Sequence, residues 1–182
     1  MAVREIVKYG DLTLRKQCGD VEDIFSVSPL VEDMFDTMYE EDGIGLAANQ
    51  IGEDLNLFVI DISHKDEAEK PRVFINSKII DKKGECLSVE GCLSIPGIQV
   101  ELKRSEFITL QYYSLEGEQK KREFNDLMAR AIQHEMDHLN GIFIVDRISD
   151  LVKMQYKKDL KEIEEVALKE SKVREKIQGI VL

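Results

Sequence analysis

The segment His134-Glu135-Met136-Asp137-His138 constrains the fold of this chain more than any other part of the sequence. Two histidines four residues apart lie one above the other on the same face of a helix, so both imidazoles can reach one metal ion. Glu135 lies next to the first histidine and can face a water molecule on that ion. Only three histidines occur in the chain, and two of them are here. The segment therefore predicts a helix that carries a metal site. The plainer interpretation is a helix whose two histidines are solvated or form a polar cluster.

Helix signals lie before and within this region. Ser28-Pro29 is expected to open a helix, because serine can cap it and proline suits its first position. Gly43 is a natural end for that helix. Asn125-Asp126 is expected to cap the helix that carries the histidines, and Gly141 to end it.

Several segments between these helices are rich in β-branched and aromatic residues, which is typical of strands. The expected strands are 55–62, 72–80, 98–102, 106–113 and 119–124, with a hairpin turn at Glu116-Gly117. Strands mixed with a few helices, without regular alternation of the two, predict an α+β fold. We expect mixed or antiparallel sheets around a central helix that carries the histidine motif, with a further helix at the C-terminus.

The bulk properties are those of one globular domain, which we expect to span residues 1–182. Its last helix is expected at 149–170, followed by a tail at 171–182. No apolar run reaches the ~18 residues that a membrane span needs, and we expect no secretory signal. Three cysteines without scaffold spacing indicate a reducing compartment, hence a cytoplasmic location. The net charge of -11 argues against binding to DNA or to an anionic membrane.

Two imidazoles do not complete a catalytic metal site, which usually has three protein ligands and one open position. Cys92 is a candidate for the third, because a glycine and a proline nearby impose an irregular backbone on its segment. Taken alone, a single cysteine is better interpreted as a small apolar residue packed in the core. A carboxylate is an alternative ligand. Cys18 and Cys86 are interpreted as core residues, and His64 as a solvated residue of a charged loop.

The segment Gly43–Gln50 contains two glycines and two alanines within six residues, which lets its backbone come close to a ligand. Gln50 supplies a neutral amide donor that suits an oxyanion. A glycine-rich helix end followed by a tightly packed strand has the same pattern, so the segment by itself does not choose between the two interpretations.

GIGLAANQ, EGCLS and QHEMDH, in this order and about forty residues apart, resemble the three signature motifs of the peptide deformylase family. The resemblance covers most of the chain, to about Arg147. It implies that Cys92, His134 and His138 bind one divalent metal ion. In that family the ion is Fe²⁺, and Zn²⁺, Ni²⁺ or Co²⁺ can substitute for it.

The resemblance also implies the reaction, which is hydrolysis of the N-formyl group from the N-terminal methionine of nascent polypeptides. In this reaction Glu135 is the catalytic carboxylate, and Gln50 and the backbone N–H of Leu93 stabilise the oxyanion. Other residues are expected to bind the substrate, by forming a tight wall against the formyl group or an apolar pocket for the methionine side chain. They are Gly43, Ile44, Gly45, Leu127 and Ala131.

Two segments depart from the commonest pattern of the family. Gly97-Ile98-Gln99 stands where some members carry Arg or Tyr, which leaves contacts beyond the first substrate residue open. Arg104 is followed by serine where proline is frequent, and we expect Arg104 still to pair with a carboxylate, with Glu90 as the candidate.

Two other functions are compatible with parts of this pattern. A zincin-like metalloprotease also uses a His-Glu-x-x-His helix, with a downstream third ligand for which Glu162, Glu164 or Glu165 is available. A non-catalytic metal-binding module would leave Glu135 without a role. Three ordered motifs favour the deformylase interpretation over both.

Lysines form a stripe at i, i+4 spacing on the last predicted helix: Lys153, Lys157 and Lys161. Some relatives use a C-terminal helix to dock on the ribosome, where such a stripe would meet RNA phosphate. Acidic residues nearly balance the charge of this segment, so a solvated helix face is the favoured interpretation and ribosome docking the second hypothesis.

Overall fold

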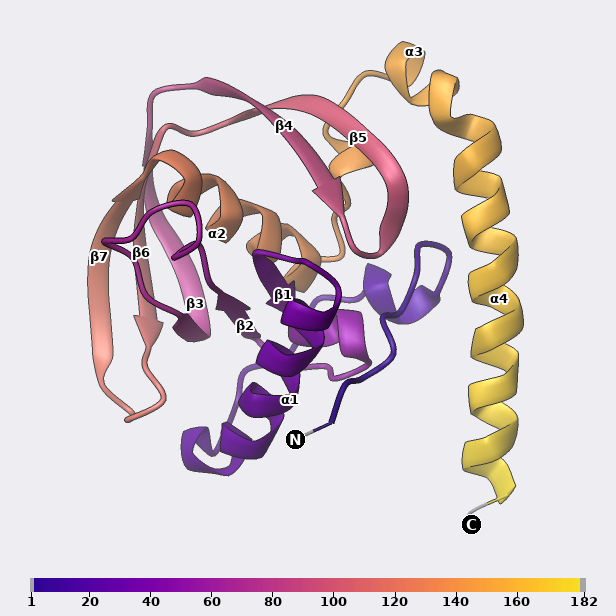
Figure 1. Ribbon diagram of the computed structural model, residues 1–182, viewed down its shortest axis with the longest axis horizontal. Coiled ribbons are helices and arrows are strands. Elements are labelled where there is room, and N and C mark those ends of the chain that lie inside the picture. Colours follow the sequence, from indigo (N-terminus) through magenta and orange to yellow (C-terminus); the bar gives the residue numbers. More distant parts are fainter. Residues whose placement is uncertain (1, 181–182) are drawn as a thin grey trace.

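The computed structural model describes the backbone of residues 2–180 and the side chains of residues 2–174. One helix lies at the centre, between a large sheet and a long hairpin (Figure 1). This helix is α2 (Asp126–Leu139). The large sheet is antiparallel and has the strand order β1-β2-β3-β6-β7. Its strands are β1 (Gly45–Ala47), β2 (Leu57–Ile60), β3 (Arg72–Lys83), β6 (Phe107–Tyr113) and β7 (Gln119–Asn125). The hairpin pairs β4 (Cys86–Cys92) with β5 (Ile95–Arg104). The expected α+β class is confirmed.

The large sheet separates two parts of the core because successive side chains of a strand point to opposite faces. In β2, Phe58 and Ile60 pack with residues of α2. Leu57 and Val59 point the other way and pack with α1 (Ser28–Glu40). All four β2 side chains are fully buried, so this strand has apolar residues on both faces.

A third part of the core lies behind the hairpin. The inward-facing residues of β5 alternate with exposed ones and pack against residues 143–145 and Leu160. Leu160 belongs to α4 (Lys157–Ile180), the long helix at the edge of the molecule. In chain order, α4 comes after the short helix α3 (Asp150–Lys153). Within the described part of the chain, no helix is both long and apolar enough to cross a bilayer.

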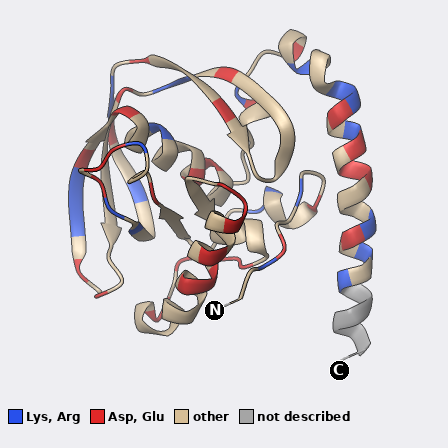
Figure 2. Ribbon diagram, in the orientation of Figure 1, with Lys and Arg blue, Asp and Glu red and all other residues tan. Residues whose placement is uncertain are grey.

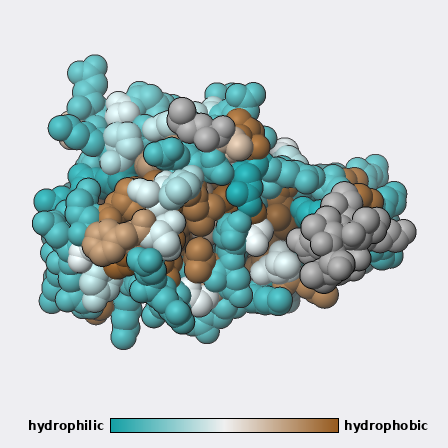
Figure 3. Space-filling view, turned by 90° about the horizontal axis from the view of Figure 1, so that it is seen from below, coloured by the Kyte–Doolittle hydropathy of each residue, from teal (hydrophilic) through white to brown (hydrophobic). Residues whose placement is uncertain are grey.

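Short 3-10 helices complete the described structure: Leu12–Arg15, Ile24–Val27, Ala48–Ile51, Ile144–Asp146 and Met154–Tyr156. The face of the molecule seen in Figure 3 is largely hydrophilic, with some apolar side chains exposed between the hydrophilic ones. Phe25, at 72% exposure, is one of the most exposed large apolar residues of the molecule.

The sequence analysis did not predict two of the strands, β1 and β4. β1 contains glycine and alanine, which have low strand propensity, and it forms only because β2 pairs with it. β4 contains serine, glutamate and glycine and was expected to be irregular, but it pairs with β5 along its whole length. The expected irregularity is confined to a register shift after Gly91. The predicted hairpin between residues 106 and 124 is confirmed, and Gly117 in its turn has a φ of 79°.

The helix ends also differ from expectation in detail. Ser28 is the first residue of α1 rather than its cap, and Asn125 caps α2 without a side-chain hydrogen bond. Gly141, with a φ of 70°, follows the end of α2 as predicted. The predicted tail is wrong for residues 171–180, which continue α4. This segment lacks proline and is rich in good helix formers, so nothing in it stops the helix. Residues 181–182 lie outside the described part.

Candidate active site

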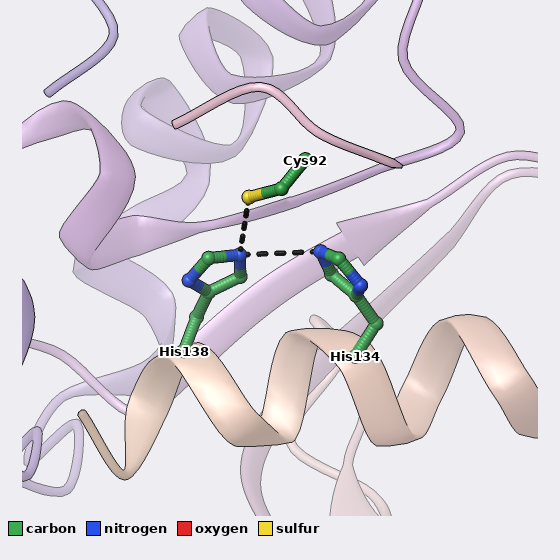
Figure 4. A group of neighbouring side chains, drawn as sticks. All are labelled: Cys92, His134 and His138. Carbon is green, nitrogen blue, oxygen red and sulfur yellow. Dashed lines mark hydrogen bonds between the residues drawn. The ribbon is translucent and has the colours of Figure 1, made fainter. Parts of the chain in front are cut away.

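Three side chains from two distant parts of the sequence meet above α2 (Figure 4). His134 and His138 project from successive turns of this helix, as their spacing predicts. The Nε2 atoms of the two rings are 3.2 Å apart, and Sγ of Cys92 is 3.1 Å from Nε2 of His138. All three ligand atoms lie within 4.8 Å of one another. The end of β4 delivers Cys92, so the hairpin closes the site from the side opposite to the helix.

The separations of these atoms suit a small metal ion. Tetrahedral bonds of about 2.3 Å to sulfur and about 2.0–2.1 Å to nitrogen place neighbouring ligands roughly 3.3–3.6 Å apart. The observed distances of 3.1 and 3.2 Å are close to that range. One thiolate and two imidazoles are a donor set that binds several divalent transition metals. The residues present therefore fit a metal ion.

The electrostatics of the site favour the protonation state of Cys92 that a metal requires. Burial disfavours the thiolate of Cys92, but the neighbouring rings of His138 and His134 outweigh this effect and hold the pKa of Cys92 well below its ordinary value. A cysteine binds metal as a thiolate, so the site already stabilises the binding form.

A buried arginine orients one of the imidazoles through a carboxylate. Arg104 donates two hydrogen bonds to Glu90, of 2.9 and 2.7 Å, and Glu90 lies 2.9 Å from Nδ1 of His134. This contact leaves Nε2 of His134 turned toward Nε2 of His138 (Figure 4). Burial raises the pKa of Glu90, but its hydrogen bonds with Arg104 and His134 outweigh burial and lower the pKa to about 2. The expected pairing of Arg104 with Glu90 is confirmed.

Arg104 also binds Asp137, at 2.6 Å, and Arg147 donates two further hydrogen bonds to the same carboxylate. Sequence reasoning missed this role of Asp137. The signal in the sequence is the position of Asp137 within the histidine motif. It lies one helical turn after Gln133, on a side of α2 that does not carry the two histidines.

Glu135 is buried, at 4% exposure, and its Oε2 atom has no hydrogen-bond partner among the described residues. Burial raises the pKa of this carboxyl. Gly45 makes room for it, because a Cβ at Gly45 would collide with Oε1 and lie 3.0 Å from Cδ of Glu135. A buried carboxylate without a partner is costly unless it has a chemical task.

Gln50 is held by both ends of its amide. Its Oε1 accepts a 2.9 Å hydrogen bond from the N–H of Ala47, and its Nε2 donates to Oγ of Ser94 at 3.1 Å. Nε2 also lies 3.9 Å from Sγ of Cys92. Leu93 lies in the two-residue turn between β4 and β5, outside the ladder. The amide of Gln50 and the turn at Leu93 therefore flank Cys92.

A cleft of about 620 Å³ leads to this site. Its walls include the expected oxyanion residues Gln50 and Leu93. They also include every residue expected to bind the substrate, namely Gly43, Ile44, Gly45, Leu127 and Ala131. The cleft is narrow at Gly43, where an added Cβ would lie 3.0 Å from Cδ1 of Leu93. Sequence reasoning missed Lys8 and Arg130, which line the same cleft.

The other candidate ligands lie elsewhere. Within the described residues, the only cluster of at least three His, Cys, Asp or Glu side chains that could hold a metal is Cys92, His134 and His138. Glu162 and Glu165 form exposed ion pairs with lysines on α4. The zincin-like arrangement, with a third ligand on the last helix, is therefore not favoured. His64 is exposed, as expected, whereas Cys18 and Cys86 are half-buried rather than fully in the core.

A thiolate and two imidazoles beside a buried carboxylate, at the end of a cleft, define the metal-dependent amide hydrolases as the class of this protein. The family model for polypeptide deformylase matches residues 3–154. The chain belongs to the peptide deformylase family, whose enzymes remove a formyl group by hydrolysis.

Individual relatives agree with this assignment. The chain is 46% identical over 151 residues to peptide deformylase 1 of Clostridium acetobutylicum, covering 82% of this chain and 97% of the relative. It is 41% identical to the peptide deformylase of Thermodesulfovibrio yellowstonii, covering 88% and 98%. The crystal structure of a peptide deformylase from Legionella pneumophila superposes with a TM-score of 0.83 at 38% identity, covering 91% of this chain and 97% of that one.

Proposed function

We propose that this chain is a single catalytic domain that hydrolyses the N-formyl group from the terminal methionine of nascent polypeptides and releases formate. The observation that carries the proposal is the buried carboxylate of Glu135, whose Oε2 has no hydrogen-bond partner within the described part of the chain, beside the Cys92, His134 and His138 cluster at the end of the cleft. We place the enzyme in the cytoplasm, where such substrates are made.

Cys92, His134 and His138 would hold one divalent metal ion, and we propose Fe²⁺ as the native ion, with Zn²⁺, Ni²⁺ or Co²⁺ as substitutes. Such an ion supplies a Lewis acid that lowers the pKa of water toward neutrality and polarises a carbonyl group. The low pKa of Cys92 and the hydrogen bond between His134 and Glu90 support this assignment.

Glu135 acts as the general base and then as the general acid. Its carboxylate accepts a proton from the water molecule that attacks the formyl carbon, and it donates this proton to the nitrogen as the C–N bond breaks. Burial raises the pKa of Glu135, which makes it a stronger base than an exposed glutamate. The products are formate and a free amino group on methionine.

Gln50 and the backbone N–H of Leu93 donate hydrogen bonds to the carbonyl oxygen as it becomes negative. Ala47 and Ser94 fix the amide of Gln50, so little reorganisation is needed when the charge develops. Losing one such donor typically costs ~3 kcal/mol of transition-state stabilisation.

Selectivity for formyl over acetyl follows from the narrow cleft at Gly43, where the side chain of Leu93 is in close contact. A formyl carbon carries only hydrogen, whereas an acetyl group adds a methyl that this space excludes. The methionine side chain would occupy the apolar part of the cleft formed by Ile44, Leu127 and Ala131.

The decisive test is turnover of formyl-Met peptides by protein purified and loaded with iron under anaerobic conditions, with acetyl-Met peptides as the control. We expect turnover of the formyl substrates only. Glu135→Gln should retain the metal and lose at least about 100-fold in kcat, as expected for loss of a general base. Cys92→Ala should lose the metal itself. Normal metal affinity in Cys92→Ala, or absence of formyl-specific turnover, would refute the proposal.

For the C-terminal helix we propose a solvated face rather than a ribosome-docking surface. Acidic and basic residues alternate along α4 (Figure 2). Lys158 and Lys161 pair with acidic residues one turn later, and Lys153 pairs with Asp146. We expect a chain truncated after Asp150 to co-sediment with ribosomes as strongly as the full chain does; weaker binding would favour the docking hypothesis.

A further inference from the structure

Arg130 lies on the wall of the substrate cleft. Of the residues that the structure describes, none forms an ion pair or a side-chain hydrogen bond with its guanidinium. The side chain is half-buried, and the chain contains 36 acidic residues against 25 lysines and arginines. An unpaired arginine in a cleft of so acidic a protein indicates that its partner arrives with the ligand.

The charge at this position is permanent, because the guanidinium does not lose its proton in proteins. A charge that is partly withdrawn from water lacks some hydration, and a carboxylate restores that loss through two parallel hydrogen bonds. The second cation of the cleft, Lys8, already donates a hydrogen bond to the backbone oxygen of Leu93, at 3.1 Å. Arg130 is therefore the cation that is available to an acidic substrate.

The position of Arg130 on α2 indicates which substrate residue it meets. It lies one helical turn before His134, which is about 6 Å along the axis. It also lies beside Leu127 and Ala131, the proposed wall of the methionine pocket. In an extended peptide, side chains two residues apart point to the same side and are about 6.6 Å apart. The third residue of the substrate thus projects toward the same wall as the methionine, while the second projects away.

We propose that Arg130 is a specificity-determining residue that binds an acidic side chain at the third position of the formyl-Met substrate. The inference rests on the proposed function and deepens it. Peptides with Glu at the third position should have a kcat/KM about fivefold higher than peptides with Gln. This factor is the upper end of the contribution that ion pairs make where water still reaches them. Lys at the third position should lower kcat/KM relative to Gln, and 0.5 M salt should reduce both effects.

The experiment uses the metal-loaded full chain and the peptides formyl-Met-Ala-X-Ser, with X as Glu, Gln or Lys, together with formyl-Met-Glu-Ala-Ser. Ratios of kcat/KM are compared within each variant, so a general loss of activity cancels. Arg130→Gln should bring the Glu to Gln ratio to about one, and Arg130→Glu should reverse the preference toward Lys. Lys8→Gln removes the other cation of the cleft and should leave the ratio unchanged.

Three outcomes overturn the inference. They are equal turnover of Glu and Gln peptides by the unaltered chain, an acid preference that survives Arg130→Gln, and a preference at the second position only. In each of them the formyl peptides are still hydrolysed, so the proposed function stands. If no formyl peptide is hydrolysed by any variant, the proposed function itself fails.

Discussion

Replacing Arg104 with methionine should destabilise this protein more than loss of any exposed cation. The Arg104 side chain is 2% exposed and lies between two buried carboxylates, Glu90 at 9% and Asp137 at 10% exposure. Methionine fills a similar volume without charge. In the variant Asp137 keeps its ion pair with Arg147, but Glu90 keeps only its contact with His134.

The magnitude follows from the charge left behind. Removing one partner of a buried ion pair costs about 3–5 kcal/mol, because the remaining charge is uncompensated. Since Asp137 stays paired, we expect the lower end, about 3 kcal/mol. A urea m-value of about 2 kcal/mol per molar converts this into a midpoint shift of roughly 1.5 M. Freed from Arg104, Glu90 should also orient His134 less well, and metal affinity should fall about 10- to 100-fold.

The assay is equilibrium unfolding in urea, followed by far-UV circular dichroism, together with competition for the metal by a chelator of known affinity. Lys103→Met is the matched control, because Lys103 is adjacent on β5 and its ion pair with Glu85 is 68% and 62% exposed. Such a pair is worth less than about 1 kcal/mol. If Arg104→Met shifts the midpoint no further than Lys103→Met, the reasoning about buried charge is wrong.

Three further predictions concern other parts of the molecule. Gly45→Ala should displace the carboxylate of Glu135 and lower kcat about 100-fold with the metal retained. Gly19→Ala is the control, because its added Cβ meets nothing closer than 3.8 Å. Equal losses of kcat in the two variants would contradict the role given to Gly45. Burial raises the pKa of Asp146, but hydrogen bonds, chiefly from Arg15, outweigh burial and lower it. The ionised Asp146 therefore stabilises the folded state at pH values above its pKa in the unfolded chain, about 3.9. This stabilisation is lost as the pH falls through the lower pKa that Asp146 has in the folded state. Urea unfolding of Asp146→Asn should show a deficit at pH 7 that shrinks below pH 3, and a deficit independent of pH would refute the assignment. Removing the metal with a chelator should lower the unfolding midpoint and abolish turnover, because a ligand that binds only the folded state stabilises it. Adding a divalent ion should restore both the midpoint and the turnover. An unfolding midpoint that does not change on chelation would argue against a resident ion.

Local patterns were enough to predict the helices and most strands. The histidine spacing placed both rings on one face of α2, because 3.6 residues per turn bring positions i and i+4 together wherever that helix forms. The apolar segments 55–62 and 72–80 likewise predicted β2 and β3. These features depend on residues close in the chain, so no knowledge of the fold was needed.

Long-range pairing explains what the sequence did not predict. β4 has Leu87 and Val89 on its exposed side, at 63% and 66% exposure, so it lacks the usual alternation toward a core. It is a strand because β5 binds it, and a partner in the ladder leaves no mark on the sequence of β4 itself. The role of Asp137 was missed for the same reason, because its partner Arg104 lies 33 residues away.

By itself, the sequence determined the two imidazoles on one helix face, the carboxylate between them and, through three ordered motifs, the family. It did not by its residues alone distinguish Cys92 as a ligand from Cys92 as a core residue. Only the tertiary structure decided that Sγ of Cys92 lies 3.1 Å from a ring nitrogen 46 residues away, in a group that could hold a metal ion. It also left Arg130 without an acidic partner among the described residues of the molecule. The physical reason is that helix periodicity acts over a few residues, whereas metal ligation and charge pairing depend on distances that only the packing of the hairpin against α2 sets.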